Sequence, residues 1–155
     1  MFIKQVSIFV ENKAGKMAEV LSVLGENGID ISALSVADKT DFGILRLIVS
    51  EPEKAEAILK ANDMIVKLTN VIAIGIEDKS GSLAEALDML SKNDIEIEYL
   101  YAFTGKTSYG ALVIIKADKP DEAVNVLKNT HISLVEPKEI YRIWGIYEKV
   151  YFMEC

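Results

Sequence analysis

Hydrophobic and polar residues alternate along two short stretches of the chain, residues 6–10 and 72–76. A period of two predicts a strand with one buried face in each place. After each stretch the apolar residues take the spacing of a single helical face, which predicts a helix that packs on a sheet. The positions on these two faces are Met17, Val20, Leu21 and Leu24, and Leu83, Ala86, Leu87 and Leu90. Gly28 is predicted to end the first helix in a left-handed conformation.

The same order of elements continues in both halves of the chain. Further strands are predicted at residues 29–36, 42–49 and 65–68, and at 95–103, 110–117 and 132–135. Ser50 and Asp118 are each followed two residues later by a proline. This spacing predicts a helix at each place, with Ser50 or Asp118 as its N-cap. The buried positions of these second helices are Ala55, Ile58 and Leu59, and Ala123, Val126 and Leu127. Each half is therefore expected to be a βαββαβ unit, with Thr69 and Asn70 alone between the two.

An internal repeat supports this division. When residues 11–34 are laid on residues 77–100, eleven of the 24 positions are identical, where chance gives about two. The identical pairs are Glu11/Glu77, Lys13/Lys79, Gly15/Gly81, Ala18/Ala84, Glu19/Glu85, Leu21/Leu87, Leu24/Leu90, Asn27/Asn93, Ile29/Ile95, Ile31/Ile97 and Leu34/Leu100. The predicted fold class is α+β, with two tandem ferredoxin-like modules at 1–69 and 70–141 and a C-terminal strand or tail at 142–155. Each module is expected to have an antiparallel sheet with its helices on one face.

The charge and the cysteine content narrow the possible partners. The formal charge of −7, without a Lys/Arg run, disfavours nucleic acid and anionic membrane as partners. Cys155 is the only cysteine, so an intramolecular disulfide is impossible and a reducing compartment is favoured. The longest apolar runs, such as residues 71–76, are too short for a signal sequence or a membrane span. A cytoplasmic protein is expected.

The candidate chemistry lies in the turn between the first strand and the first helix of each copy. Gly15 and Gly81 are expected to let the backbone approach a neighbour closely, and the free N–H groups of the next helical turn suit a carboxylate. Asn12 or Asp78 suits an ammonium or amide group. The two ends of a zwitterionic amino acid would fit such a turn, with an apolar pocket formed by Met17, Leu83, Ile29 and Ile95. The alternative is a tight turn with a locally capped helix, which the capping-box pair Ser82 and Glu85 supports.

These turns and the Asn-x-Ile-x-Ile segment after each helix resemble the signature of the ACT domain family, and the resemblance covers nearly the whole chain twice. It implies a regulatory module that binds an amino acid where two modules meet, between the first loop of one module and the second strand of its neighbour. The implied loop residues are Asn12, Lys13, Ala14, Gly15, Lys16 and Met17, with Asp78, Lys79, Ser80, Gly81, Ser82 and Leu83. The implied strand residues are Ile29, Asp30 and Ile31, with Ile95, Glu96 and Ile97.

The two copies depart from this signature in different ways. Ala14 and Ser80 stand where the family often has a proline, and the turn is expected to survive this change. Asp94 stands where the first copy has Gly28, so an altered backbone is expected there, and the two sites are expected to be unequal.

The function predicted from the sequence is a non-catalytic sensor that binds a free amino acid and modulates a partner enzyme or regulator in trans, as a homodimer without cofactor or metal. The alternative is a regulatory subunit that acts through protein contacts alone. An enzyme is disfavoured because the sequence has no Ser-His-Asp or Cys-His arrangement, metal cluster or phosphate-binding loop. An RNA-binding module is disfavoured because the sheet lacks aromatic–basic motifs and the net charge is negative.

Several conspicuous residues are interpreted as structural. Tyr99, Tyr101 and Phe103 alternate along one strand, so they share a sheet face and are expected to pack against another surface. His131, the only histidine, is expected to be a solvated residue near the last strand. Trp144 and Tyr147 are expected to pack at an interface.

Overall fold

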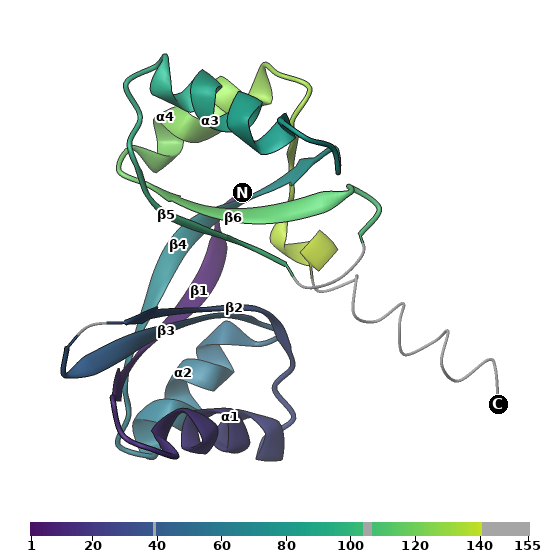
Figure 1. Ribbon diagram of the computed structural model, residues 1–155. Coiled ribbons are helices and arrows are strands. Elements are labelled where there is room, and N and C mark those ends of the chain that lie inside the picture. The colour runs from purple at the N-terminus through teal and green to yellow at the C-terminus, as the bar shows by residue number, and fades with distance from the viewer. Residues whose placement is uncertain (39, 104–106, 141–155) are drawn as a thin grey trace, which may run out of the picture. The chain divides into compact units, whose positions relative to one another are not determined.

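The computed structural model describes residues 1–38, 40–103 and 107–140 of the chain, which divide into two compact units (Figure 1). The first unit is Lys4–Asn70. The second combines Met1–Ile3 with the described residues from Val71 onward. The predicted tail and the interface residues Trp144 and Tyr147 lie outside the described residues. No helix of the described segments is long and apolar enough to cross a membrane.

The first unit has the predicted βαββαβ order. Its elements are β1 (Ile3–Glu11), α1 (Lys16–Glu26), β2 (Ile31–Asp38), β3 (Phe42–Val49), α2 (Pro52–Ala61) and the first half of β4 (Ile65–Ile76). The strands are ordered β2-β3-β1-β4, and β3 pairs antiparallel with both β1 and β2. The two helices cover one face of this sheet (Figure 1). This is the ferredoxin-like arrangement.

The second unit repeats this arrangement. Its elements are the second half of β4, then α3 (Ser82–Ser91), β5 (Ile97–Ala102), β6 (Ala111–Ala117), α4 (Pro120–Lys128) and the two-residue β7 (Ser133–Leu134). Antiparallel pairs join β4 to β7, β4 to β6 and β6 to β5. The chain is therefore two tandem ferredoxin-like modules of the α+β class, as the sequence predicted.

One prediction about the connection between the copies was wrong. Two strands were expected, at 65–68 and 72–76, but β4 runs without a break from Ile65 to Ile76. The boundary between the compact units, at Asn70 and Val71, falls inside this strand. The physical reason is that the two alternating patterns meet without a glycine or proline between them, and the β-branched Thr69 favours extended backbone.

The cores are built from the predicted helical faces and strand positions. Val20, Leu24, Ala86 and Leu90 are buried, and Leu21, Leu83 and Leu87 pack partly against the cores. The second helices bury Ala55, Leu59, Ala123 and Leu127 completely. Met17 is the exception, because 38% of it is exposed and it does not join the core of its unit.

Each of the four described helices has an asparagine at its C-cap or, after α3, one residue beyond the C-cap Lys92, and the side-chain amide of that asparagine bonds back to the helix. The amide nitrogens of Asn27, Asn62, Asn93 and Asn129 donate to carbonyl oxygens four residues earlier, over 2.8, 2.9, 2.9 and 3.0 Å. These bonds satisfy acceptors that the end of a helix leaves without a partner. After α1, Gly28 has φ 68° and the Ile29 N–H donates to the Leu24 carbonyl, so the predicted left-handed cap is confirmed.

The backbone at Asp94 does not differ from that at Gly28, so the expected alteration was wrong. Asp94 has φ 55°, and the following Ile95 N–H donates to Leu90 in the same way. A left-handed conformation is strained for most residues but tolerated by aspartate. Lys119 adds support, since its Nζ donates to the Asp94 carbonyl oxygen at 2.7 Å and to Oδ2 at 3.3 Å.

The predicted N-caps of the second helices were also displaced by one residue. The N-caps are Glu51 and Lys119, and neither makes a side-chain cap hydrogen bond. The side chains of Ser50 and Asp118 instead accept from the N–H groups of Asp30 and Glu96, at 3.2 and 2.9 Å. These side chains connect the start of a helix to the segment just before the second strand of the same unit, a long-range partner that local spacing does not reveal.

Candidate functional site

The first loop of each unit turns on a left-handed glycine. Gly15 and Gly81 are the N-caps of α1 and α3, with φ 84° and 92°. A Cβ atom added at either glycine would meet nothing within 4 Å. No other described part of the chain therefore lies close to these glycines, and the positive φ by itself requires glycine at both positions.

The helix starts next to these glycines have no side-chain caps. Among the described residues, the N–H groups of Met17 and Ala18 in α1 find no acceptor, and the same holds for the matching groups of Leu83 and Ala84 in α3. The predicted capping box is absent, because Ser82 is the first residue of α3 instead of its N-cap. Both loops therefore present free donors at the positive end of a helix dipole.

A cavity of about 300 Å³ lies beside the first loop, within the first unit. Its walls come from β1, the loop, α1, β2 and β3. The lining residues are Val10, Glu11, Asn12, Lys13, Ala14, Met17, Val36, Gly43 and Leu45. Four of the predicted loop residues are in this set, while Gly15 and Lys16 are not.

Charge and hydrogen bonding fix the polar side of this cavity. Lys13 Nζ lies 2.7 Å from a carboxylate oxygen of Glu11, and this hydrogen bond lowers the pKa of Glu11 and raises that of Lys13. The Asn12 amide nitrogen donates to the Thr40 carbonyl oxygen at 3.5 Å, which leaves Oδ1 directed near Gly43. The apolar side is formed by Met17, Val36 and Leu45.

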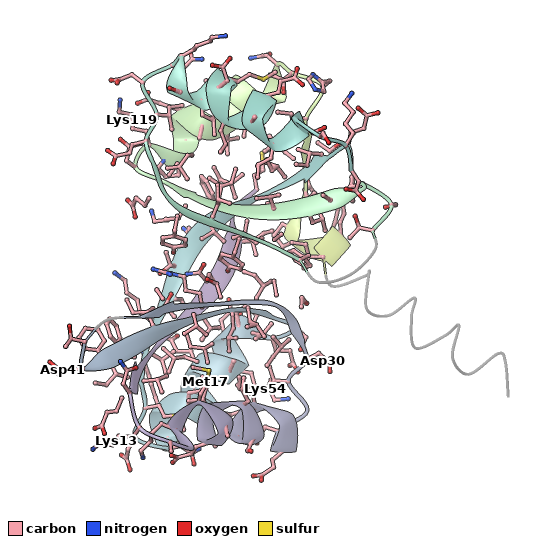
Figure 2. The ribbon with its side chains drawn as sticks, viewed as in Figure 1. Lys13, Met17, Asp30, Asp41, Lys54 and Lys119 are labelled. Atoms are coloured by element: carbon pink, nitrogen blue, oxygen red, sulfur yellow. The ribbon has the colours of Figure 1, made fainter. Side chains whose placement is uncertain are left out.

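The predicted strand residues lie elsewhere in the same unit. Ile29 is buried, Ile31 packs against the core, and Asp30 is exposed. Asp30 lies at the opposite end of α1 from Lys13 (Figure 2). One module alone therefore does not bring the predicted loop and strand residues together. The same division holds in the second unit, where Ile95 is buried, Ile97 packs against the core and Glu96 is exposed.

The second unit has a cavity of about 330 Å³ beside its first loop, on a different flank. It lies where β7 begins, and residues of β4, α3, the turn before β6, the segment before β7 and the first residue of β7 line it. The lining residues are Gly75, Ile76, Glu77, Ser82, Glu85, Ser108, Tyr109, His131, Ile132 and Ser133. Of the predicted loop residues only Ser82 is among them; Asp78, Lys79, Ser80, Gly81 and Leu83 are not.

Sequence reasoning missed the walls of both cavities. Val36 and Gly43 contribute to the first cavity. The sequence offered one weak signal for each: Val36 is an apolar residue on a strand predicted from its pattern, and Gly43 stands where the second copy has Ala111. His131 and Tyr109 contribute to the second, and nothing in the local sequence connects either residue to Ser82. The described residues contain no group of three or more side chains that could hold a metal ion.

Comparison with known families gives a match over nearly the whole chain. The model described as an ACT domain pair matches residues 1–144. The chain belongs to this family. The predicted resemblance is thus confirmed, and the two ferredoxin-like units are the two ACT modules of the pair.

Solved structures agree with this assignment. The ACT domain pair is similar to protein BT0572 from Bacteroides thetaiotaomicron, with 41% identity over 91% of this chain and 96% of that one and a TM-score of 0.85. It has the fold of the regulatory subunits of aspartate kinase from Thermus thermophilus and Thermus flavus. The Thermus thermophilus subunit has 16% identity and a TM-score of 0.58 over 83% of this chain and 91% of that one. The Thermus flavus subunit has 13% identity and a TM-score of 0.55 over 79% of this chain and 88% of that one. Comparison with curated proteins found no match.

Proposed function

We propose that this chain is a non-catalytic regulatory protein that binds a free amino acid and thereby changes the activity of a partner enzyme or regulator in trans. The observation that carries the proposal is the first-unit cavity, because four residues of the predicted loop line it beside an uncapped helix start. Its volume of about 300 Å³ suits a small ligand. The Thermus structures are named as regulatory subunits, and the proposal takes from them only that class of role.

The cavity offers a partner for each part of an amino acid. The free N–H groups of Met17 and Ala18 suit the carboxylate, because they lie at the positive end of α1. The side-chain oxygen of Asn12 suits the ammonium group. Met17, Val36 and Leu45 suit an apolar side chain. The proposed ligand is therefore an amino acid with a small apolar side chain.

We propose in addition that two copies of the chain pair through β2. This strand ends the strand order, with β3 as its one neighbour in the described part of the chain, so its other edge offers unpaired backbone groups. Leu34 and Val36 on β2 are each 46% exposed, which is unusual for apolar residues on a strand of this size. Val36 also lines the cavity, so a second copy at this edge would cover the ligand. Ile29, Asp30 and Ile31 of that copy are proposed to complete the site.

The corresponding proposal for the second module uses Asp78, Lys79, Ser80, Gly81, Ser82 and Leu83, with Ile95, Glu96 and Ile97 from a neighbouring module. The left-handed Gly81 and the uncapped start of α3 support this, since they repeat the first loop. A regulator that works through protein contacts alone is the alternative, and the exposed Leu34 and Val36 suit that function equally well.

A thermal-shift screen of the full chain against the twenty amino acids tests the function. A ligand at 100 times its Kd stabilises the folded state by about 2.7 kcal/mol, which is a readily measured rise in Tm. Met17→Glu is expected to abolish the rise because it places a carboxylate in the cavity. Ile65→Glu is the matched control, since Ile65 is an exposed apolar residue of the same unit that does not line the cavity.

Each result has a clear meaning. No rise with any amino acid would contradict the sensing function and favour the contact-only alternative. A rise that survives Met17→Glu would contradict the assignment of the first cavity. Sedimentation of the chain with and without the ligand then measures the dimer, which is expected to be strengthened by the ligand and weakened by Val36→Lys.

A further inference from the structure

The boundary between the two compact units is crossed by two neighbouring strands, β1 and β4. Ile3 is the first residue of β1 and belongs to the second unit, whereas the strand from Lys4 onward belongs to the first. β4 makes the reverse passage, with residues 65–70 in the first unit and residues 71–76 in the second. Each unit therefore contains a short segment that leads into a strand of the other unit.

These two leading segments pack in the core of the unit that contains them. Phe2 packs against the second core, and Ile3 beside it is fully buried. Leu68 packs against the first core. The alignment that lays residue 11 on residue 77 also lays Phe2 on Leu68. Equivalent residues of the repeat thus lie in opposite cores, and the arrangement is reciprocal.

Past the boundary, each strand enters the other core and ends at a cavity. Lys4 Nζ pairs with Glu53 in the first turn of α2, which marks the entry of β1 into the first unit. The two strands then bury matching alternate positions, which are Val6, Ile8 and Val10 in the first core and Ile72, Ile74 and Ile76 in the second. Glu11 lines the first-unit cavity, and Glu77 lines the second-unit cavity. Each strand therefore connects the core of one unit to the first loop of the other.

The second unit depends on its leading segment because its own last strand is short. β7 has two residues and pairs with Ile74 and Gly75 of β4. In the first unit the last strand is longer, and both Val66 and Leu68 on it pack against the core. A small module has little core to spare, so one aromatic side chain is a considerable share of it. Phe2 adds apolar surface that a strand of two residues does not supply.

We propose that the two units stabilise each other through these strands, and that a ligand bound at either first loop therefore stabilises both. When the second core opens, Phe2 is released and β1 loses its start. When the first core opens, Leu68 is released and the second half of β4 loses its start. A ligand that holds the loop at the far end of either strand opposes these openings, which gives a positive coupling between the two units. The ligand-dependent part rests on the proposed amino-acid-binding function, whereas the mutual stabilisation does not.

Native-state hydrogen exchange of the ¹⁵N-labelled full chain measures the opening of each unit separately. Phe2→Ala is expected to speed the slowest amides of α3 and α4 about tenfold, because it truncates a side chain of the second core. Leu68→Ala is expected to speed the slowest amides of α1 and α2 by about the same factor. Independent modules, each with its own N-terminal segment, would give the opposite pattern.

Ile65→Ala is the matched control for Leu68→Ala. Ile65 lies on the same strand but is 69% exposed and is not among the residues of either core. It is expected to leave both sets of amides at their wild-type rates. Phe2→Leu is a milder second variant, expected to speed the amides of α3 and α4 about threefold. Wild-type rates in α3 and α4 for both Phe2 variants would overturn the inference, as would an effect of Leu68→Ala on these two helices alone.

Addition of the amino acid that gives the largest thermal shift then tests the coupling. The slowest amides of both units are expected to exchange more slowly in its presence, because each unit opposes the opening of the other. Slower exchange confined to one unit would overturn the coupling. If no amino acid binds the wild-type chain, the proposed function is wrong, and the rates of the Phe2 and Leu68 variants alone decide whether the units stabilise each other.

Discussion

The two modules differ in side-chain size where the first strand ends and the third begins. At the end of the first strand and the start of the third, the rings of Phe9 and Phe42 in the first module pack in a tilted arrangement, with an angle of 47° between their planes. The second module has Gly75 and Gly110, and Tyr109 lies over Gly75. Asp41 occupies the position that matches Tyr109. The two modules have the same strand order here, but the aromatic side chains lie on the strands in the first module and in the turn before β6 in the second.

The two first loops share Glu11/Glu77, Lys13/Lys79 and the left-handed Gly15/Gly81, but their cavities lie on different flanks. In the first module the cavity opens toward β2 and β3, where Gly43 provides room and Val36 a wall. In the second module Ala111 matches Gly43, and the space lies toward β7. The lesson is that the repeat specifies the helix start, whereas the neighbours of the loop decide where a ligand fits.

The largest change in stability is expected from Gly110→Val in the second module. Gly110 has φ 86°, and a Cβ there would lie 2.6 Å from the Ile76 carbonyl oxygen. The left-handed backbone and the steric clash together should destabilise the second module by about 3 kcal/mol. Chemical denaturation followed by circular dichroism measures this loss. Gly43→Ala is the matched control in the first module, where a Cβ finds ordinary contacts at 3.5 Å, and a change within about 0.5 kcal/mol is expected. Equal losses in the two variants would contradict the proposed difference.

A smaller effect is expected from Tyr109→Phe. The Tyr109 hydroxyl donates to Glu139 Oε1 at 2.6 Å, and this bond raises the pKa of Tyr109 above its ordinary value of 10. Loss of the bond should reduce stability by about 1 kcal/mol at neutral pH. Because the pKa is raised by folding, the stabilisation is complete below pH 10 and disappears as the pH rises through the folded-state value. Urea denaturation of both proteins at pH 7 and above pH 10 measures this, and a difference that grows with pH would refute the assignment.

The smallest change in stability is expected from substitutions of the two left-handed aspartates that follow helices. Asp63 and Asp94 both have left-handed backbone, with φ 60° and 55°. Asp63→Gly should raise stability by about 0.5 kcal/mol, because glycine has no Cβ strain in this conformation. Asp94→Gly should raise it less, since Lys119 loses its bond to the Asp94 carboxylate. Thermal unfolding of the two variants measures the order, and a larger gain at position 94 would show that Lys119 contributes nothing.

The order of the elements was predictable because it depends on local patterns. The alternation in β1, the helical face with Leu24 and Leu90, and the left-handed Gly28 all follow from spacing and residue type. The error at the N-caps of the second helices has a long-range cause. Ser50 was expected to cap α2, but its hydroxyl bonds to Asp30, twenty positions away. The spacing of residues along the sequence does not indicate such distant partners.

The candidate site was predictable only where it coincides with the repeated loop. Gly15 and Gly81 were correctly placed at helix starts, and their left-handed backbone requires glycine there. The walls of the cavities come from segments distant in sequence, as Val36 and His131 illustrate. Met17 was expected in the core because its spacing is that of a buried face. It lies in the first turn of α1, where a cavity separates it from the sheet residues Val36 and Leu45, and it remains 38% exposed.

The four asparagines at the helix ends have a consequence for how such a protein arises by gene duplication. Each asparagine lies just after its helix and bonds back to that helix, so a copied module carries these bonds with it. No residue of another module is needed to stop a helix at the right length. Mutations at the other end of the module, around the loops, can then accumulate without unravelling the scaffold. Stable endings at one end are therefore compatible with different cavities at the other, as the two modules show.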